Sequence, residues 1–161
     1  MSTPHGQESL SQALAHIVSG CYVLTVRDPL AGPQAILLSF VQQVGLTPPR
    51  IAIAIHKERS IVPALDRAGA FVLNVCAQGD TLLRTKFADP AVTPAAALRA
   101  VGAREVGAGL VLEPAAAHLV CGIARRIDIG DHWLYIADAR DGAAVGGRAP
   151  FVHVRRSGLS Y

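Results

Sequence analysis

Residues 35–56, AILLSFVQQVGLTPPRIAIAIH, contain the pattern that decides the fold. Two apolar runs are joined by a polar loop that ends in a double proline. In the second run Ile51, Ile53 and Ile55 alternate with alanines. A period of two residues is typical of a β-strand, and small residues on its other face indicate close packing on both sides. We therefore expect two strands here.

The composition is that of one domain with a high apolar content. The chain has 161 residues, of which 51% are hydrophobic and 17% charged, so it is more apolar than an average soluble protein. Such a chain has either a large core or a face that is buried against a partner, and we expect a homodimer. We expect residues 1–161 to form a single domain.

Several classes of protein are not expected. Residues 29–49 carry no charge, but glutamines, a glycine and prolines interrupt the run and argue against a membrane-spanning helix. The net charge of +3 is too small to indicate a nucleic-acid partner. The N-terminus lacks a secretory signal pattern, so we expect a cytoplasmic protein. Cys21, Cys76 and Cys121 are expected to be buried free thiols, and no metal-ligand spacing appears.

The rest of the chain predicts more strands than helices. Extended patterns cover residues 21–26, 35–44, 50–56, 70–76, 117–129, 132–140 and 150–154. Helical patterns run from Ser9 or Ser11 to Val18 and over residues 60–67 and 80–88, and residues 91–114 are expected to be a partly helical excursion. Because most of these strands are joined by turns, we expect a mainly β, antiparallel barrel with a few short helices.

Lys57-Glu58-Arg59-Ser60 lies between a predicted strand and a predicted helix. Backbone amides at such a junction favour an anion, Arg59 can donate two parallel hydrogen bonds, and Ser60 adds a hydroxyl. The cluster therefore suits a terminal phosphate. The alternative is a solvated charged turn in which Ser60 caps the helix.

His132 follows the predicted Gly130-Asp131 turn and precedes the apolar run that begins at Trp133. A strand start after a tight turn can hold its imidazole rigidly at a pocket, and imidazole changes its charge near neutral pH. Asp131 is better suited to fixing the turn or orienting His132 than to acting as a base. The alternative is an exposed turn histidine without a chemical role.

Together, the loop from Ser39 to Pro49, the basic cluster and the Gly-Asp-His turn resemble the flavin reductase-like family of flavin mononucleotide (FMN)-binding split barrels. The version of the loop is most similar to that of the flavin reductase domain in flavodiiron proteins. The resemblance implies an antiparallel split β-barrel of the Greek-key type. It departs from the family at Gly45, where a serine is usual, so one hydroxyl is missing. The alternative for this loop is an ordinary polar hairpin loop.

The resemblance also implies the roles of individual residues. The isoalloxazine ring would lie against the loop backbone, with Leu38, Ser39, Phe40, Val41 and Gln42 as binding residues. Lys57, Arg59 and Ser60 would bind the phosphate. His132 would be the catalytic residue, near the nicotinamide, where it orients the dinucleotide or supplies a proton. The C-terminal residues 153–161, with a basic pair, Ser-Gly and a terminal tyrosine, would be ordered near the active site or the dimer partner.

The activity implied is an NAD(P)H:flavin oxidoreductase, with FMN, or alternatively FAD, as cofactor and NADH or NADPH as co-substrate. The reduced flavin would serve a flavin-dependent oxygenase or another electron acceptor. No glycine-rich dinucleotide fingerprint occurs, so the nicotinamide would use a cleft beside the flavin. Two alternatives stay open. One is an FMN-carrying electron-transfer module that a partner protein reduces, and the other is a non-catalytic flavin-binding protein.

Overall fold

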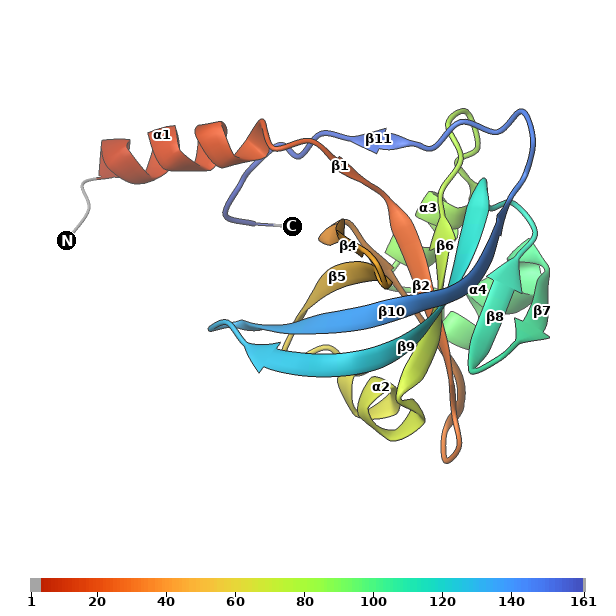
Figure 1. The fold of residues 1–161 in the computed structure, drawn as a ribbon. Helices are drawn as coiled ribbons and strands as arrows, with labels where there is room; N and C mark the ends of the chain where they lie inside the picture. The colour runs from red at the N-terminus through yellow and green to blue at the C-terminus, as the bar shows by residue number, and fades with distance from the viewer. Residues whose placement is uncertain (1–3, 161) are drawn as a thin grey trace.

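Seven antiparallel strands form one curved sheet in the order β3-β2-β6-β9-β10-β5-β4 (Figure 1). The structure is a computed structural model that describes residues 4–160. The strands are β2 (Tyr22–Asp28), β3 (Gly32–Leu38), β4 (Val41–Leu46), β5 (Pro49–His56), β6 (Ala70–Val75), β9 (Ala117–Asp128) and β10 (His132–Ala144). Only Ser39 and Phe40 separate the two edge strands β3 and β4 along the chain, so the edges of the sheet meet there. The mainly β, antiparallel barrel is confirmed.

Two short ribbons and four helices surround this sheet within residues 4–160. The ribbons pair β1 (Ser19–Gly20) with β11 (Val152–His153) and β7 (Ala103–Val106) with β8 (Gly109–Leu112). The helices are α1 (Pro4–Ala15), α2 (Val62–Ala68), α3 (Leu82–Ala88) and α4 (Pro94–Val101). Helix α2 packs on β2 and β6, whereas α3 and α4 pack on β3. Helix α1 projects away from the barrel (Figure 1).

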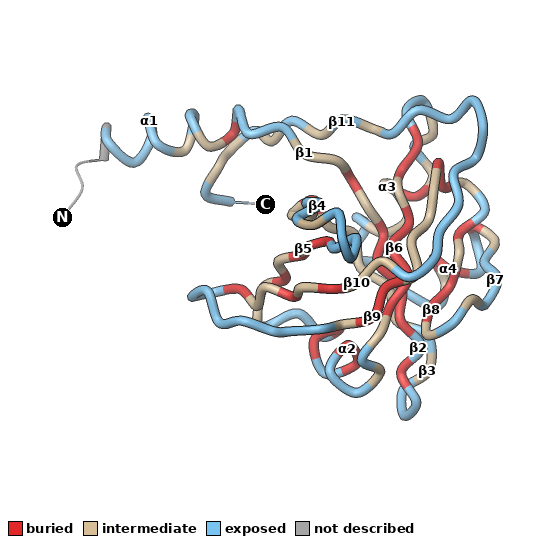
Figure 2. Tube along the Cα trace, in the orientation of Figure 1, coloured by how far each residue is buried: buried red, intermediate tan, exposed pale blue. Residues whose placement is uncertain are grey.

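The central strands are apolar on both faces because both faces are covered (Figure 2). On β2, Leu24 and Val26 belong to the cluster inside the barrel, together with Phe71 and Tyr135. Val23 belongs to a second cluster, to which α3, α4 and β8 contribute. Its other buried members are Cys21, Cys76, Leu83, Leu98, Val101, Leu110, Leu112 and Ala115. The three cysteines are free and buried, as the sequence predicts.

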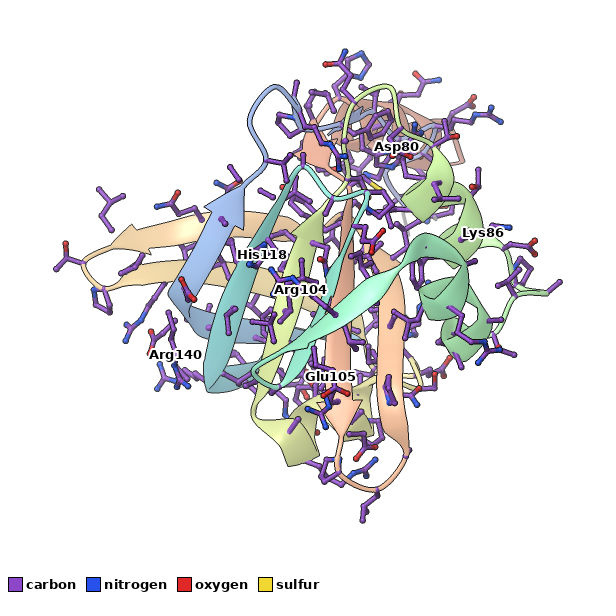
Figure 3. All side chains as sticks on the ribbon, turned by 90° about the vertical axis from the view of Figure 1, so that its right-hand side faces the viewer. Asp80, Lys86, Arg104, Glu105, His118 and Arg140 are labelled. Atoms are coloured by element: carbon purple, nitrogen blue, oxygen red, sulfur yellow. The ribbon has the colours of Figure 1, made fainter. Side chains whose placement is uncertain are left out.

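The β7–β8 hairpin lies across the outer face of the sheet (Figure 3). Two buried polar side chains, Thr25 and Asn74, hold it there. Thr25 Oγ1 donates to Leu110 O at 2.6 Å and accepts from Leu110 N at 2.9 Å. Asn74 Nδ2 donates to Leu110 O at 3.0 Å, while its Oδ1 accepts from Leu112 N at 2.9 Å. A Cβ at Gly109 would lie 2.6 Å from Thr25 O, so a residue without a side chain is needed for this close approach.

Three predicted elements differ from the structure. The polar segment between the two apolar runs is not a loop but the edge strand β4, which pairs with β5 along one side only, so glutamines are tolerated there. The extended run 35–44 is therefore broken at Ser39 and Phe40. The partly helical excursion 91–114 contains α4 but also the β7–β8 hairpin, which the alanine and glycine content concealed.

The first helix also differs, because it spans Pro4–Ala15 instead of ending at Val18. Neither Ser9 nor Ser11 caps it, since both lie within the helix, and the hydroxyl of Ser11 lies 2.9 Å from Ser157 Oγ. The last predicted strand, 150–154, is shortened to β11. The remaining predicted strands and helices are confirmed with shifts of a few residues at their ends.

We expect Asn74→Leu to lower the free energy of unfolding by about 1–3 kcal/mol, because it leaves the buried Leu112 amide without its acceptor. Urea denaturation measures this. Glu105→Gln is the matched control on the same hairpin, since it removes only the exposed ion pair with Arg27 and should change the stability by less than about 0.5 kcal/mol. Equal effects of the two substitutions would show that Asn74 does not hold the hairpin.

Candidate functional site

Strand β5 sorts its side chains onto two faces. Ile51, Ile53 and Ile55 are buried in the barrel, whereas Ala52 and Ala54 are half-buried on the outer face, where His56 follows them. Small alanines between bulky neighbours leave a recess on the outside of the sheet. The alternation in the sequence therefore builds the core with one face and the floor of a pocket with the other.

The register of β10 against β5 brings two histidines together. His132, the first residue of β10, is opposite His56, the last residue of β5, and Leu134 is opposite Ala54. Directly opposite residues share a face, so both imidazoles lie on the outer face with the alanines. Their rings meet edge to face, with centroids 5.2 Å apart and an interplanar angle of 81°. The ring of Phe40 lies 5.8 Å from that of His132.

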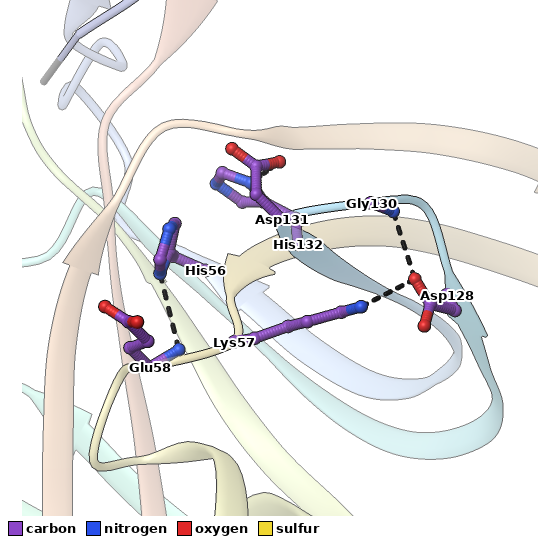
Figure 4. Close-up of polar contacts among 7 residues, drawn as sticks. All are labelled: His56, Lys57, Glu58, Asp128, Gly130, Asp131 and His132. Carbon is purple, nitrogen blue, oxygen red and sulfur yellow. Dashed lines mark hydrogen bonds and ion pairs between the residues drawn. The ribbon is translucent and has the colours of Figure 1, made fainter.

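Each histidine has a polar partner of its own (Figure 4). His132 Nδ1 lies 2.8 Å from Asp131 Oδ1, and the imidazole is almost buried while the carboxylate is exposed. This hydrogen bond from His132 lowers the pKa of Asp131, which is therefore ionised at neutral pH and accepts from Nδ1–H. The backbone amide of Glu58 donates to His56 Nδ1 at 3.3 Å, so a neutral His56 carries its proton on Nε2.

Two pockets meet at Phe40. The histidine pocket, of about 410 Å³, is lined by Phe40, His56, Asp131 and His132 together with the C-terminal residues Arg155 and Gly158–Ser160. The alanine pocket, of about 530 Å³, has Ala52, Ala54 and Leu134 on its floor and is closed by Ser39–Gln42, by residues 17–20 and by Phe151. Its walls are mainly apolar, with hydroxyls at Ser19 and Ser39.

The predicted ring-binding residues lie at the junction of the two edge strands. Leu38 ends β3, Val41 and Gln42 begin β4, and Ser39 and Phe40 form the connection. Ser39, Phe40, Val41 and Gln42 all line the alanine pocket. Phe40 O accepts from Ala54 N at 3.0 Å, which fixes the connection against β5. Of this set, Phe40 lies beside His132, and Leu38 lines a small neighbouring recess instead of the alanine pocket.

Gly45, where the sequence departs from the family, lies at a bulge of β4. A Cβ at this position would lie 3.1 Å from Pro48 O and 3.2 Å from Arg50 Cβ. The closeness of the β4–β5 turn therefore accounts for glycine at this position.

The predicted phosphate-binding residues separate in the structure. Arg59 shares a small recess with Ser39, Phe40 and His56. Lys57 instead extends to the β9–β10 hairpin, where its Nζ lies 2.7 Å from Asp128 Oδ1 (Figure 4). The same Nζ lies 4.6 Å from the centre of the Trp133 ring. Ser60 is exposed and does not cap α2, whose N-cap position is Ile61.

His56 and Arg155 line the histidine pocket, although no sequence motif marks either of them as a functional residue. The pairing of His56 with His132 depends on the register between β5 and β10, which no local pattern reveals. Arg155 reaches Phe40 only because the chain returns past α1. The sequence offers one weak signal for each residue. His56 directly precedes the basic cluster, and Arg155 belongs to the basic pair of the C-terminal segment.

Two features are absent from the described part of the chain, namely a metal-binding cluster and a membrane-spanning helix. No cluster of three or more histidine, cysteine, aspartate or glutamate side chains within residues 4–160 has a geometry that could hold a metal ion. In the same range, no helix has the length and apolar character that crossing a membrane requires.

Comparison with known proteins agrees with the fold. The NADH:FAD oxidoreductase SgcE6 of Streptomyces globisporus has a similar structure, with a TM-score of 0.80, 23% identity, and coverage of 98% of this chain and 93% of that one. The flavin reductase of the styrene monooxygenase from Pseudomonas putida S12 matches with a TM-score of 0.75 at 18% identity, covering 88% of this chain and 89% of that one. Both support the split-barrel architecture.

The sequence comparisons give the family. Diflavin flavoprotein A 3 of Synechocystis sp. and A 6 of Nostoc sp. are each 32% identical to this chain, over 93% and 95% of its length. The chain spans about a quarter of these relatives, 25% and 27%. The family profile described as "Flavin reductase like domain" matches residues 14–158. This chain therefore belongs to the flavin reductase-like family.

Proposed function

We propose that this protein is an NAD(P)H:flavin oxidoreductase that binds FMN and transfers a hydride to it from the nicotinamide. The observation that carries the proposal is the junction of β3 and β4, where the alanine pocket meets the histidine pocket at Phe40. A redox enzyme that works on two ring systems needs them side by side, and proximity supplies much of its rate. Two pockets that share one wall provide such an arrangement.

The residues of the alanine pocket fit a flavin. A flat ring with a polar edge needs apolar walls and a few hydrogen-bonding groups at its rim. Ala52, Ala54 and Leu134 offer a low apolar floor. Ser19 Oγ is buried and has no hydrogen-bond partner among residues 4–160, and it lines this pocket. A ligand with a polar edge would satisfy it.

Arg59 and Ser60 are the residues that we propose for the phosphate. Helix α2 contributes little, because it has only seven residues and carries Pro63 in its first turn, where no backbone N–H is available. Arg59 lies in the recess next to Ser39 and Phe40, so it is close to the proposed ring site. Lys57 is engaged with Asp128, and we expect a smaller contribution from it.

A bound flavin would supply the hydride-accepting chemistry. The chain's own part is to hold the partners and to manage a proton. Asp131 fixes the ring of His132 through Nδ1, and the imidazole of His132 is the group that we propose for the proton exchange. Phe40 and the neighbouring apolar side chains reduce the access of water. Reduced flavin would then pass to an acceptor such as a flavin-dependent oxygenase.

One observation favours a second candidate function, an electron-transfer module reduced by a partner protein. The curated relatives are about four times as long as this chain, so in them the matching domain is one part of a larger protein. Reduction by nicotinamide alone separates the two candidates, because a module that depends on a partner would bind FMN without being reduced by NADH or NADPH.

We expect Arg59→Ala to weaken the binding of FMN roughly tenfold or more, because charge-assisted hydrogen bonds to a phosphate would be lost. Riboflavin, which lacks the phosphate, should bind to the variant almost as it does to the wild type. Fluorescence titration with both ligands measures this. Lys57→Ala is the comparison and should weaken FMN binding less. Equal losses for FMN and riboflavin would place the phosphate elsewhere.

We expect His132→Ala to slow the anaerobic reduction of bound FMN by NADH or NADPH by roughly tenfold or more, with little change in FMN affinity. Stopped-flow absorbance measures the rate. His16→Ala, on the exposed end of the first helical segment, is the control and should have no effect. If His132→Ala is reduced as fast as the wild type, His132 has no role in hydride transfer.

We further propose a homodimer, as the high apolar content suggests. Four large apolar side chains of the arm formed by β1, β11 and their flanks are exposed, namely Ile17, Val18, Val152 and Val154, at 58–62%. A second copy of the chain would cover them. Sedimentation equilibrium at tens of micromolar, a concentration on the order of that suited to a stable dimer, should give twice the chain mass. A monomer at this concentration would refute the proposal.

A further inference from the structure

The C-terminal segment 155–160, here called the strap, is docked on α1. Ser157 Oγ lies 2.9 Å from Ser11 Oγ, and the backbone amide of Gly158 donates to Ser11 O at 2.9 Å. Arg155 Nη2 donates to Leu14 O at 3.2 Å. The projecting helix and the strap therefore support each other across 146 residues of sequence, while β1 and β11 pair beside them.

Gly158 is required for this docking. A Cβ at position 158 would collide with Leu14 Cβ and would lie 2.7 Å from Ser11 O. Both obstacles belong to α1, and one of them is backbone, so any larger residue must move the strap away from the helix. The strap can thus be displaced by a single methyl group without any change in its charges.

The docked strap places the guanidinium of Arg155 at the site. Its Cζ lies 4.8 Å from the centre of the Phe40 ring, a stacking arrangement typical of arginine on an aromatic face. Arg155 lines the histidine pocket with His56 and His132. Its Nε is buried and has no hydrogen-bond partner among residues 4–160. Among residues 4–160, the guanidinium donates one hydrogen bond, from Nη2 to Leu14 O.

The charges around this guanidinium favour an anionic ligand. Asp131 is the only acidic side chain among the described residues that line the histidine pocket, and His132 already engages it. On the other side of Arg155, the neighbouring pocket is lined by Arg156, His153 and hydroxyls, without a carboxylate among residues 4–160. A guanidinium presents paired donors that match two oxygens of a phosphate.

We propose that Arg155, held in place by the docking of the strap on α1, binds a phosphate group of the nicotinamide dinucleotide and so positions the nicotinamide beside His132. This rests on the proposed function, because the histidine pocket is taken as the place where the dinucleotide enters. The proposal assigns the dinucleotide a binding residue in a chain that has no glycine-rich fingerprint for it.

Equilibrium binding of NAD⁺ and NADP⁺ to the FMN-loaded full chain tests this without any turnover. We expect Arg155→Gln to weaken binding roughly tenfold or more and to reduce its dependence on salt, because one cation–phosphate contact is lost. FMN affinity should change less than about twofold. Arg156→Gln is the matched control, since it removes the same charge from the exposed next residue and should weaken nucleotide binding much less than Arg155→Gln does.

Gly158→Ala gives an independent check that keeps Arg155 in the chain. It should weaken nucleotide binding in the same direction as Arg155→Gln, because the strap is displaced. A loss confined to NADP⁺ would assign the extra phosphate of that nucleotide to Arg155, and equal losses would assign the pyrophosphate. Either result supports the proposal.

Wild-type-like binding by both Arg155→Gln and Gly158→Ala would overturn the proposal, as would equal losses in Arg155→Gln and Arg156→Gln. Failure of the proposed function has a different signature. In that case Arg155→Gln weakens nucleotide binding, but NADH and NADPH do not reduce the FMN of the wild type. Arg155 would then be a nucleotide-binding residue in a protein that is not a reductase.

Discussion

The alternation of isoleucine and alanine along β5 is the constraint on which the rest of the structure depends. The isoleucines fill the barrel, and with Tyr135 and Phe71 they exclude water from its centre. The alanines on the opposite face are too small to cover the sheet, so the outer face keeps a recess. A shift of β10 by one residue against β5 would turn its apolar side chains away from the barrel. The same pattern therefore also fixes the register that places His132 opposite His56. The alternation along β5 therefore determines the core, the floor of the alanine pocket and the position of the histidine pair.

Much of the barrel is predictable from local pattern, because its strands are long, alternate clearly or are apolar on both faces. The β9–β10 hairpin is an example, since Gly130 and Asp131 mark its turn and two long apolar runs flank it. The β7–β8 hairpin cannot be predicted from local pattern. Its strands have four residues each and are held by Thr25 and Asn74, which come from other parts of the chain.

The site is predictable only in part. Ser39, Phe40 and His132 belong to motifs that are continuous in sequence, and the structure gathers them at one place. Lys57 belongs to a continuous motif as well, but Asp128, 71 residues away, holds its amine elsewhere. His56 and Arg155 enter the site through strand register and through the docking of the strap on α1, and neither depends on a local pattern. Long-range packing thus decides which members of a motif act together.

The barrel and the segments outside it contribute different parts of the two pockets. The barrel supplies the floor of the alanine pocket, whereas β1, β11, their flanks and the strap line the two pockets from outside. A change in that arm would alter access to the histidines without disturbing the core. The relatives that contain this domain within a longer chain are consistent with such a division.

A crystal structure of the protein with bound FMN would test the central claim most directly. The account predicts the ring in the alanine pocket, against Ser39–Gln42 and the floor formed by Ala52 and Ala54, with the phosphate at Arg59 and one edge of the ring facing His132. Binding of FMN in another part of the molecule, such as the polar surface pocket beside α3, would contradict it. So would an alanine pocket filled by the chain's own side chains in the presence of saturating FMN.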